Sequence, residues 1–405
     1  MKTFIKIAWR NIWRNKYRTT ITLLGISLGL TSLIFIRSFI DGADTQMIEN
    51  YTNLVTGHIQ IHKKGFKKRV SLELSIEEPY KIEKILKKFP QIKAFTKRIK
   101  NYALISSSEN SSGILLIGIE PEKEKLITNL NKHIKKGKFL SKDNEIIIGK
   151  TLAEVLNVDI GEKVAVMSQG YDGSLCAQSY RVCGILDTGA EEFDRSIAII
   201  TLNAAQNLLV LGKKVSEFVI HSSVYKIDKL KKDLEKVIDT QEFEVLSWKE
   251  ISPIMVQWLE FDRAFSNVIL LIVLIVVSAS ILNTMLMAVM ERTKEFGIMR
   301  ALGTKKRQII FLVALESSFL GIIGIILGTI LGISISLYFS YKGIDLSKFS
   351  QALESYYTGS VIYPRIFLGY TTLWILIVFL TTVVSSLYPA YKAANLKPAE
   401  ALRFQ

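Results

Sequence analysis

Four long apolar runs dominate the hydrophobic pattern of the chain, at residues 19–40, 265–290, 309–341 and 366–391. The second and fourth runs carry no charged side chain, the first carries only Arg37, and the third carries only Glu316. Each run exceeds the roughly 20 residues that a helix needs to cross about 30 Å of hydrocarbon. The pattern therefore predicts four transmembrane helices. The first run is not read as a signal peptide, because its basic leader is long and no small-x-small cleavage site follows it.

Residues 41–262, between the first two runs, alternate short strand-like and helix-like stretches, which predicts a mixed α+β domain. We expect this domain to have two lobes, with residues 120–213 inserted into the outer one. The predicted strands are His58–His62, Ile92–Ile105, Gly113–Ile119, Glu145–Ile148, Lys163–Met167, Ser179–Leu186, Ser196–Ile200, Glu217–His221 and Glu242–Leu246. The predicted helices are Ile82–Phe89, Thr151–Leu156, Leu202–Leu209 and Ile227–Ile238.

Basic residues flank the apolar runs unequally and so predict the orientation of the chain. Residues 1–18 hold six cations and no acid, the loop 291–308 holds six cations and two acids, and the tail 392–405 is also basic. The loop 342–365 is nearly balanced. Because basic loops stay in the cytoplasm, both termini and the loop 291–308 are expected there, and residues 41–262 outside.

The net charge of +15 does not indicate a nucleic-acid-binding protein. Residues 41–262 contain 32 lysines and arginines against 31 acids, so almost all of the excess lies beside the apolar runs. A nucleic-acid footprint would lie on the water-exposed domain instead. The mean hydropathy of +0.27 agrees with membrane segments joined to a large soluble part.

The stretch 1–18 also has apolar residues near helical spacing, namely Phe4, Ile5, Ala8, Ile12 and Trp13, with cations between them. This pattern predicts an amphipathic helix that lies in the cytoplasmic interface of the membrane before the chain enters the bilayer.

Small residues and one acid stand out inside the apolar runs. Glycines one turn apart let helix backbones approach closely in lipid, and we expect this packing at Gly25, Gly29, Gly324, Gly328 and Gly332. Gly25 and Gly29 could serve a dimer or a contact within one chain. Glu316 is expected to pair with a nearby cation, Arg300 or Arg307, because an unpaired acid in lipid is costly.

No catalytic constellation is evident in the domain 41–262, and we expect neither an enzyme active site nor a metal site. His58 and His62 share one strand face, but no further ligand at metal spacing joins them, so they are interpreted as solvent-facing histidines. Cys176 and Cys183 could form a local disulfide outside the cytoplasm, or be two ordinary thiols with Cys183 buried on a strand. The segment Ser168–Ser179 is either a plain hairpin tip or a loop that contacts a partner.

The loop 291–306, with the sequence ERTKEFGIMRALGTKK, carries most of the functional information. Charged residues alternate with an apolar set, and Gly303 follows. The apolar set is Phe296, Ile298, Met299, Ala301 and Leu302. The pattern predicts a short amphipathic helix across the cytoplasmic ends of the second and third membrane helices. A soluble motor protein would need such a ridge to grip the membrane part.

The stretch Leu286–Gly303, which contains most of this loop, resembles the coupling segment of the FtsX-like, MacB-type ABC transporter permeases. The C-terminal Tyr388–Arg403 is similar to the closing motif of that family. The opening Ala8–Asn15 and the stretch Gly57–Ile61 resemble its lipoprotein-releasing, LolC/LolE-like branch. The resemblance extends over the whole chain, in order, and its two cytoplasmic motifs are the more specific.

The resemblance implies a MacB-like (type VII ABC) permease of the bacterial inner membrane that has its large domain in the periplasm. It implies contact with a separate cytoplasmic ATPase, and the residues that would make this contact are Glu291, Arg292, Glu295, Phe296, Gly297, Arg300 and Gly303. ATP and Mg²⁺ would bind to that ATPase, and this chain would hold no cofactor. A second permease copy or paralogue would complete a dimer, and a periplasmic carrier or adaptor is a further expected partner.

The resemblance implies a type of mechanism more firmly than a substrate. The leading hypothesis is release of lipoproteins from the inner membrane, followed by export of peptides, drugs or other lipids from the periplasmic side. A third hypothesis is a transmitter that moves no substrate and controls a cell-wall hydrolase. The hairpin by which lipoprotein-releasing permeases recruit a carrier would fall near Ser168–Ser179, where its residues have no clear match.

Overall fold

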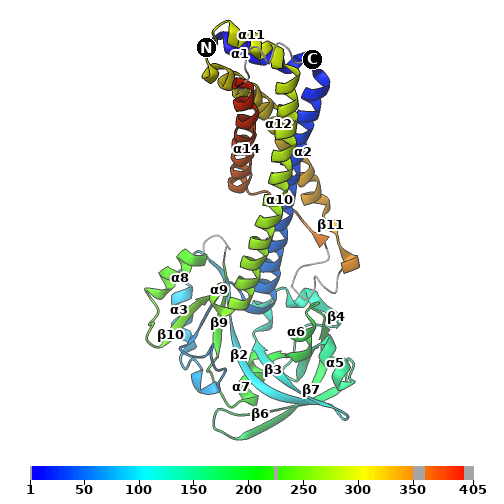
Figure 1. Ribbon diagram of the computed structural model, residues 1–405. Helices are drawn as coiled ribbons and strands as arrows, with labels where there is room; N and C mark the ends of the chain where they lie inside the picture. The colour runs from blue at the N-terminus through cyan, green and yellow to red at the C-terminus, as the bar shows by residue number, and fades with distance from the viewer. Residues whose placement is uncertain (1, 223–226, 350–360, 396–405) are drawn as a thin grey trace. The chain divides into compact units, whose positions relative to one another are not determined.

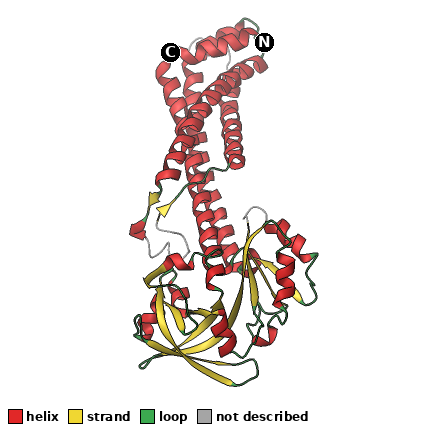
Figure 2. Cartoon of the chain, turned by 180° about the vertical axis from the view of Figure 1, so that it is seen from behind, coloured by secondary structure: helices red, strands yellow, loops and turns green. Residues whose placement is uncertain are grey.

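The computed structural model describes residues 2–222, 227–349 and 361–395. It divides the chain into two compact units. The helical unit comprises Met1–Thr45, Leu259–Leu346 and Val361–Gln405. The sheet unit comprises Gln46–Trp258 and Ser347–Ser360. Figure 2 shows the contrast between the two units, since the first is almost entirely helical and the second mixes strands with helices.

Among the described residues, the helical unit is built from six helices (Figure 1): α1 Lys2–Arg14, α2 Lys16–Tyr51, α10 Pro253–Glu291, α11 Thr293–Ala301, α12 Lys306–Lys342 and α14 Leu368–Ala394. Four of these, α2, α10, α12 and α14, are long and apolar enough to cross a membrane. Three of the four predicted spans fall within one of these helices, and the fourth, 366–391, begins two residues before α14, so the predicted set is confirmed. The chain between α12 and α14 contains a two-stranded ribbon of β11 Ile344–Asp345 and β12 Val361–Ile362, and a 3-10 helix at Ser347–Phe349.

Helices α2 and α10 are longer than the apolar runs that predicted them. α2 continues to Tyr51 rather than ending at residue 40, and α10 already begins at Pro253. The added turns contain polar residues, which the hydropathy pattern excludes from a span but which helical hydrogen bonding tolerates. The boundaries of the outer domain therefore move from residues 41 and 262 to residues 46 and 258.

Glycines allow the helices of this unit to pack at very short distance. A Cβ atom on Gly29 would lie 2.3 Å from Val277 Cγ2 of α10, and one on Gly324 would lie 2.7 Å from Ile26 of α2. A Cβ atom on Gly328 would lie 2.7 Å from the carbonyl oxygen of Ser27. Thr31 Oγ1 also donates a hydrogen bond of 3.1 Å to the carbonyl oxygen of Gly328. Since lipid provides no hydrophobic force between helices, this close backbone approach is a main source of their association.

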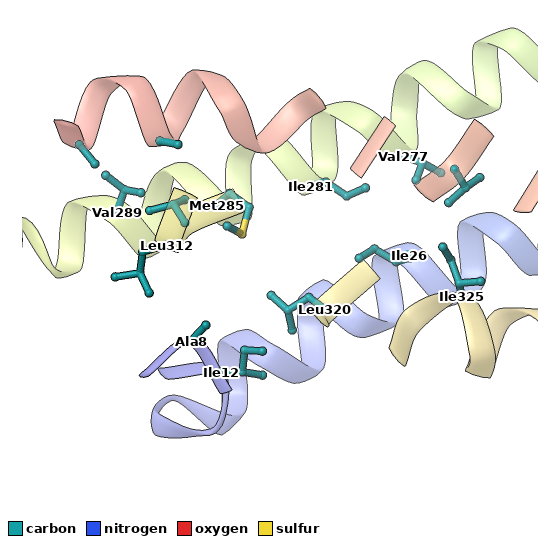
Figure 3. Close-up of a cluster of buried hydrophobic side chains, with 14 of the residues drawn as sticks. Ala8, Ile12, Ile26, Val277, Ile281, Met285, Val289, Leu312, Leu320 and Ile325 are labelled. Carbon is teal, nitrogen blue, oxygen red and sulfur yellow. The ribbon is translucent and has the colours of Figure 1, made fainter. Parts of the chain in front are cut away.

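The apolar core of the helical unit includes side chains from all six helices. Its buried members include Ile26 and Leu30 of α2, Ile281 of α10, Leu320 of α12 and Val378 of α14. Figure 3 draws part of this cluster and also shows Ala8 and Ile12, through which α1 joins it. The amphipathic stretch at the N-terminus therefore packs one face against the bundle, while Trp9, Trp13 and Tyr17 remain exposed.

The sheet unit is built on one ten-stranded sheet in the order β10-β1-β9-β2-β3-β8-β5-β7-β4, with β6 paired to β2 and β7. Most neighbours are antiparallel, and the β3–β8 and β5–β7 pairs are parallel. The strands are β1 Ile59–Lys63, β2 Ile92–Ser106, β3 Ser111–Ile119, β4 Ile134–Gly137, β5 Glu145–Gly149, β6 Lys163–Gln169, β7 Leu175–Leu186, β8 Ile197–Thr201, β9 Glu217–Ser222 and β10 Phe243–Ser247. The helices are α3 Pro79–Leu86, α4 Pro121–Glu124, α5 Lys150–Leu156, α6 Glu191–Ser196, α7 Leu202–Leu208, α8 Ile227–Glu235 and α9 Trp248–Ile251.

All nine predicted strands and all four predicted helices are present, so the mixed α+β class is confirmed. Strand β4 was missed because its sequence, IKKG, has one apolar residue and no alternation. The strands within the predicted lobe 120–213 gather at one end of the sheet, as β8-β5-β7-β4 with β6. However, hydrogen bonding runs continuously from β2 through β3 into this group, so one sheet serves both predicted lobes.

Strand β1 lies in the interior of the sheet between β9 and β10, and this position corrects the interpretation of the histidines. His58 and His62 are buried rather than solvent-facing. The ring of His58 lies 4.6 Å from that of His221, and His62 Nδ1 lies 3.2 Å from Glu244 Oε1. Burial lowers the pKa of His58 to about 4, with a smaller contribution from His221 and Lys93, which keeps it neutral at neutral pH.

The two cysteines do not form the disulfide that their spacing left open. Both lie on β7 and both are free. Seven residues of extended strand separate their Cα atoms by roughly 23 Å, whereas a disulfide needs less than about 7 Å. Cys183 is buried, as the alternative interpretation expected.

Replacing Gly328 should destabilise the helical unit. In the Gly328→Ala variant the added methyl group must push against the backbone of Ser27, which cannot rotate away. We expect a loss of about 1–3 kcal/mol, measured as a lower melting temperature of the detergent-solubilised protein. The matched control is Gly369→Ala on α14, where a Cβ atom meets nothing within 4 Å. Equal melting temperatures for the two variants would contradict the packing account.

Asp194 should make the stability of the protein depend on pH. Burial raises the pKa of this carboxyl from 3.8 to about 6, against the lowering effect of hydrogen bonds donated by Thr188. The neutral acid therefore stabilises the fold fully below pH 3.8, and this contribution is lost as the pH rises through 6. Asp194→Asn removes the ionisation. The free energy of unfolding of this variant, relative to wild type, should therefore rise by about 1 kcal/mol between pH 5 and pH 8. Melting curves of both proteins at both pH values measure this change. The same difference in stability between variant and wild type at pH 5 and pH 8 would refute the prediction.

Candidate functional site

Helix α11 is a short connector between α10 and α12, and it lies within the predicted amphipathic segment 291–306. It begins at Thr293, with one residue between it and the end of α10, and it ends at Ala301. Gly303 then adopts a φ of 91°, a left-handed conformation that glycine tolerates best and that stops the helix. α11 is therefore shorter than predicted, because the chain from Leu302 to Lys305 forms a turn.

One face of α11 is anchored in the helical unit. Phe296 is only 1% exposed, and Gly297 is buried beside it. The guanidinium carbon of Arg292 lies 5.3 Å from the centre of the Phe296 ring. The resemblance suggested these three residues as contacts for the ATPase. In the structure they instead fix α11 to its own chain.

Arg292 is also the partner of Glu316, which corrects the prediction of Arg300 or Arg307. Arg292 Nη1 donates hydrogen bonds of 3.0 Å to both carboxylate oxygens of Glu316, and both side chains are buried. Asn11 Nδ2 of α1 donates a third hydrogen bond of 2.6 Å to Glu316 Oε1. Arg300 instead donates to the carbonyl oxygen of Thr304 at 3.0 Å. The buried group that joins α1, α11 and α12 is called the Glu316 node below.

Glu295 extends these contacts toward the surface. It accepts a hydrogen bond of 2.9 Å from Arg292 Nε and forms an ion pair with Arg14 of α1. Partial burial acts to raise the pKa of Glu295, but the hydrogen bonds from Arg14 and Arg292 outweigh it and lower the pKa. Glu295 therefore stays ionised and holds α1 against α11. A separate pair joins Arg18 Nη1 to Glu291 Oε2 at 3.0 Å, between the adjacent ends of α2 and α10.

The opposite face of α11 is open. Lys294, Ile298 and Leu302 follow one another at helical spacing and are all exposed, with 48% of Ile298 and 82% of Leu302 accessible. We call these three residues the exposed stripe of α11. None of the three is among the seven residues that the resemblance suggested for contact with the ATPase. Ile298 and Leu302 do belong to the apolar set of this loop. Their signal was the helical period, which puts them opposite Phe296 and Gly297.

The seven residues suggested for ATPase contact thus differ in accessibility. Glu291 and Gly303 are exposed, and Glu295 and Arg300 are half-buried. Arg292, Phe296 and Gly297 are buried within the chain.

The predicted closing motif is only partly within the described residues. Its first part, Tyr388–Asn395, covers the end of α14 and the residue that follows it, and Pro389, Ala390, Ala393 and Ala394 are buried there. Asn395 Oδ1 accepts a hydrogen bond of 2.6 Å from Lys306 Nζ, which links the ends of α14 and α12. Residues 396–403 of the motif lie outside the described part of the chain.

In the sheet unit, the predicted loop Ser168–Ser179 is the end of a β-hairpin. Strands β6 and β7 pair up to Gln169 and Leu175, and residues 170–174 form the tip. Leu175 is 83% exposed at this point. A single exposed apolar side chain is common on protein surfaces, so Leu175 does not by itself distinguish a plain hairpin tip from a partner contact.

Family comparisons agree with both units. A model of the MacB-like periplasmic core domain matches residues 19–237, more than half of the chain. A second model, the FtsX-like permease C-terminal domain, matches residues 267–398, which include α11 and most of the Glu316 node. The chain belongs to the FtsX-like, MacB-type permease family. Two branches of this family are represented among its relatives.

The first branch has names that refer to lipoprotein release. The chain is 23% identical to the "Lipoprotein-releasing system transmembrane protein LolC" of Neisseria meningitidis, over 96% of this chain and 94% of the relative. It is 24% identical to the LolE protein of Haemophilus influenzae, over 99% of both chains.

The second branch has a longer architecture. The chain is 24% identical to the "Macrolide export ATP-binding/permease protein MacB" of Campylobacter jejuni, over 98% of this chain but only 60% of that protein. This FtsX-like permease is thus similar in extent to LolC and LolE, and it aligns with only part of MacB.

Proposed function

We propose that this chain is the permease subunit of an ATP-driven complex in which a separate ATPase acts on the sheet unit through the membrane helices. The observation that carries the proposal is the exposed stripe of α11, on a helix whose other face is fixed by Phe296 and the Glu316 node. A rigid apolar ridge beside a lysine is suited to docking into a groove of a soluble protein.

The orientation proposed for this complex follows the distribution of charge. The α1 and α11 end of the helical unit carries the basic flanks, so it lies in the cytoplasm, where the ATPase and its MgATP are found. Both termini lie on that side, and the sheet unit lies in the periplasm of a bacterial inner membrane. The chain binds no cofactor of its own in this scheme, and ATP hydrolysis belongs to the partner.

The proposed substrate is a lipoprotein that the complex releases from the inner membrane. Support comes from the LolC and LolE relatives, which match this chain over nearly their full length. The complex would contain two permease chains, either two copies or a copy and a paralogue. The exposed Leu175 at the β6–β7 hairpin is the surface proposed for a periplasmic carrier or adaptor.

Export of a peptide, drug or other lipid is the second candidate, and the MacB relative favours it. A transmitter that controls a cell-wall hydrolase has the same mechanical requirements. The lipoprotein content of inner membranes from cells with and without the gene would separate the first two, because only loss of a lipoprotein-releasing complex leaves lipoproteins behind in that membrane.

Leu302→Asp should break the contact with the ATPase. A carboxylate in the middle of an apolar contact must be desolvated without a partner, so we expect at least a tenfold loss of ATPase from the affinity-purified complex. The measurement is the ratio of ATPase to permease after purification in mild detergent. The matched control is Leu175→Asp, which alters a leucine of the same exposure in the sheet unit.

The outcome decides whether the ATPase docks on the exposed stripe of α11. Loss of ATPase from Leu302→Asp, with full retention by Leu175→Asp, supports docking on the exposed stripe. Full retention by Leu302→Asp, or no ATPase with wild type under any mild condition, would overturn the proposal.

A further inference from the structure

The chain connects α11 to its two neighbouring helices in unequal ways. Only Arg292 separates α11 from α10, and the backbone hydrogen bonds from Arg292 N to Val289 O and from Phe296 N to Arg292 O continue across the junction. On the other side, α11 and α12 are joined by the turn that contains Gly303. A displacement of α11 is therefore passed directly to α10 by the backbone, and only loosely to α12.

The Glu316 node supplies the missing connection between α11 and α12. Its two hydrogen bonds of 3.0 Å join Arg292, the residue directly before α11, to a point ten residues into α12. The side chains of Arg292 and Glu316 are only 8% and 7% exposed. In such a buried site Glu316 would lose its cationic partner if it separated from Arg292, so the pair resists separation far more than a surface ion pair does.

Further hydrogen bonds to Glu316 and Arg292 make the geometry of the Glu316 node rigid. Asn11 occupies Glu316 Oε1 from the side of α1, and Glu295 accepts from Arg292 Nε. The side chain of Glu316 is thus held from two directions, by α1 and by α11. One residue further along α12, Ser317 Oγ donates a hydrogen bond of 2.7 Å to Ser386 Oγ of α14 and makes no contact of this kind with α11.

We propose that Glu316 is a positioning residue that makes α12 move together with α11 when the ATPase acts. This inference rests on the proposed function, because it assumes that force enters at the exposed stripe of α11. Beyond the node, α12 is packed against α2 through Gly324, Gly328 and Gly332, so motion of α12 is shared with α2. Docking and transmission then belong to opposite faces of the same short helix.

The test measures binding, hydrolysis and movement in one preparation. Glu316→Gln keeps the size of the side chain but removes the charge that holds Arg292. The permease–ATPase complex would be purified from a background in which Cys176 and Cys183 are replaced, with spin labels at Tyr341, exposed at the end of α12, and Val237, exposed in the sheet unit. Double electron–electron resonance then reports the distance between the labels without nucleotide and with ATP and vanadate.

We expect Glu316→Gln to retain the ATPase and its hydrolysis within about twofold of wild type, while the nucleotide-driven shift in distance falls at least fivefold. Ser317→Ala is the matched control, because it removes a buried hydrogen bond of the adjacent residue on the same helix and should retain the full shift. A purely structural role for Glu316 would instead reduce ATPase retention, hydrolysis and the shift together.

A second variant guards against a failure of Glu316→Gln to fold. Glu316→Asp keeps the charge but is one methylene shorter, so it cannot reach Arg292 and Asn11 together, and it should lose about half of the shift. A wild-type shift in either variant, or an equal loss in Ser317→Ala, would overturn the inference while leaving the docking proposal intact. Absence of an ATPase from the wild-type preparation would overturn both.

Discussion

The helical unit depends on a constraint set by its solvent. Lipid tails are as apolar as leucine, so helices in the bilayer gain little by hiding apolar side chains from them. The unit associates instead through short backbone approach, as between Gly328 and Ser27, and through polar groups that find partners inside the bundle. The Thr31 hydroxyl, the Ser317–Ser386 pair and the Glu316 node all follow from this requirement. Each of them fixes the rotation of a helix as well as its distance.

The sheet unit is stabilised differently, because water surrounds it and the hydrophobic effect acts in full. Isoleucine side chains on β5 and β8 are almost completely buried. The unit also buries a charge pair, in which Arg98 Nη2 of β2 donates to Glu124 Oε1 of α4 at 2.5 Å. A buried pair contributes specificity more surely than net stability, and here it determines where α4 lies on the sheet.

Sequence patterns predicted those features that depend on local periodicity. The four spans, nine of the ten strands of the main sheet and the presence of a short helix near α11 all have a clear period of hydrophobic residues. Contacts between distant segments could not be predicted in this way. Arg300 and Arg307 are closer to Glu316 along the sequence than Arg292 is. Arg292 nevertheless forms the hydrogen bonds to Glu316, because of the way the chain folds around α11. The same limit applies to His58 and His62, whose burial depends on β10, about 180 residues further along the chain.

The interior position of β1 has a consequence for how the protein is made. β1 is among the first strands to be synthesised, but its neighbours β9 and β10 are the last two strands of the main sheet. Its backbone groups therefore find these partners only after almost the whole domain has been synthesised, and contacts of such long sequence separation form slowly. During that interval, the stretch Ile59–Lys63 is a bare strand edge that can pair with other chains. Synthesis of the segment that carries β10, just before α10, is thus the step that completes the sheet and ends this exposure.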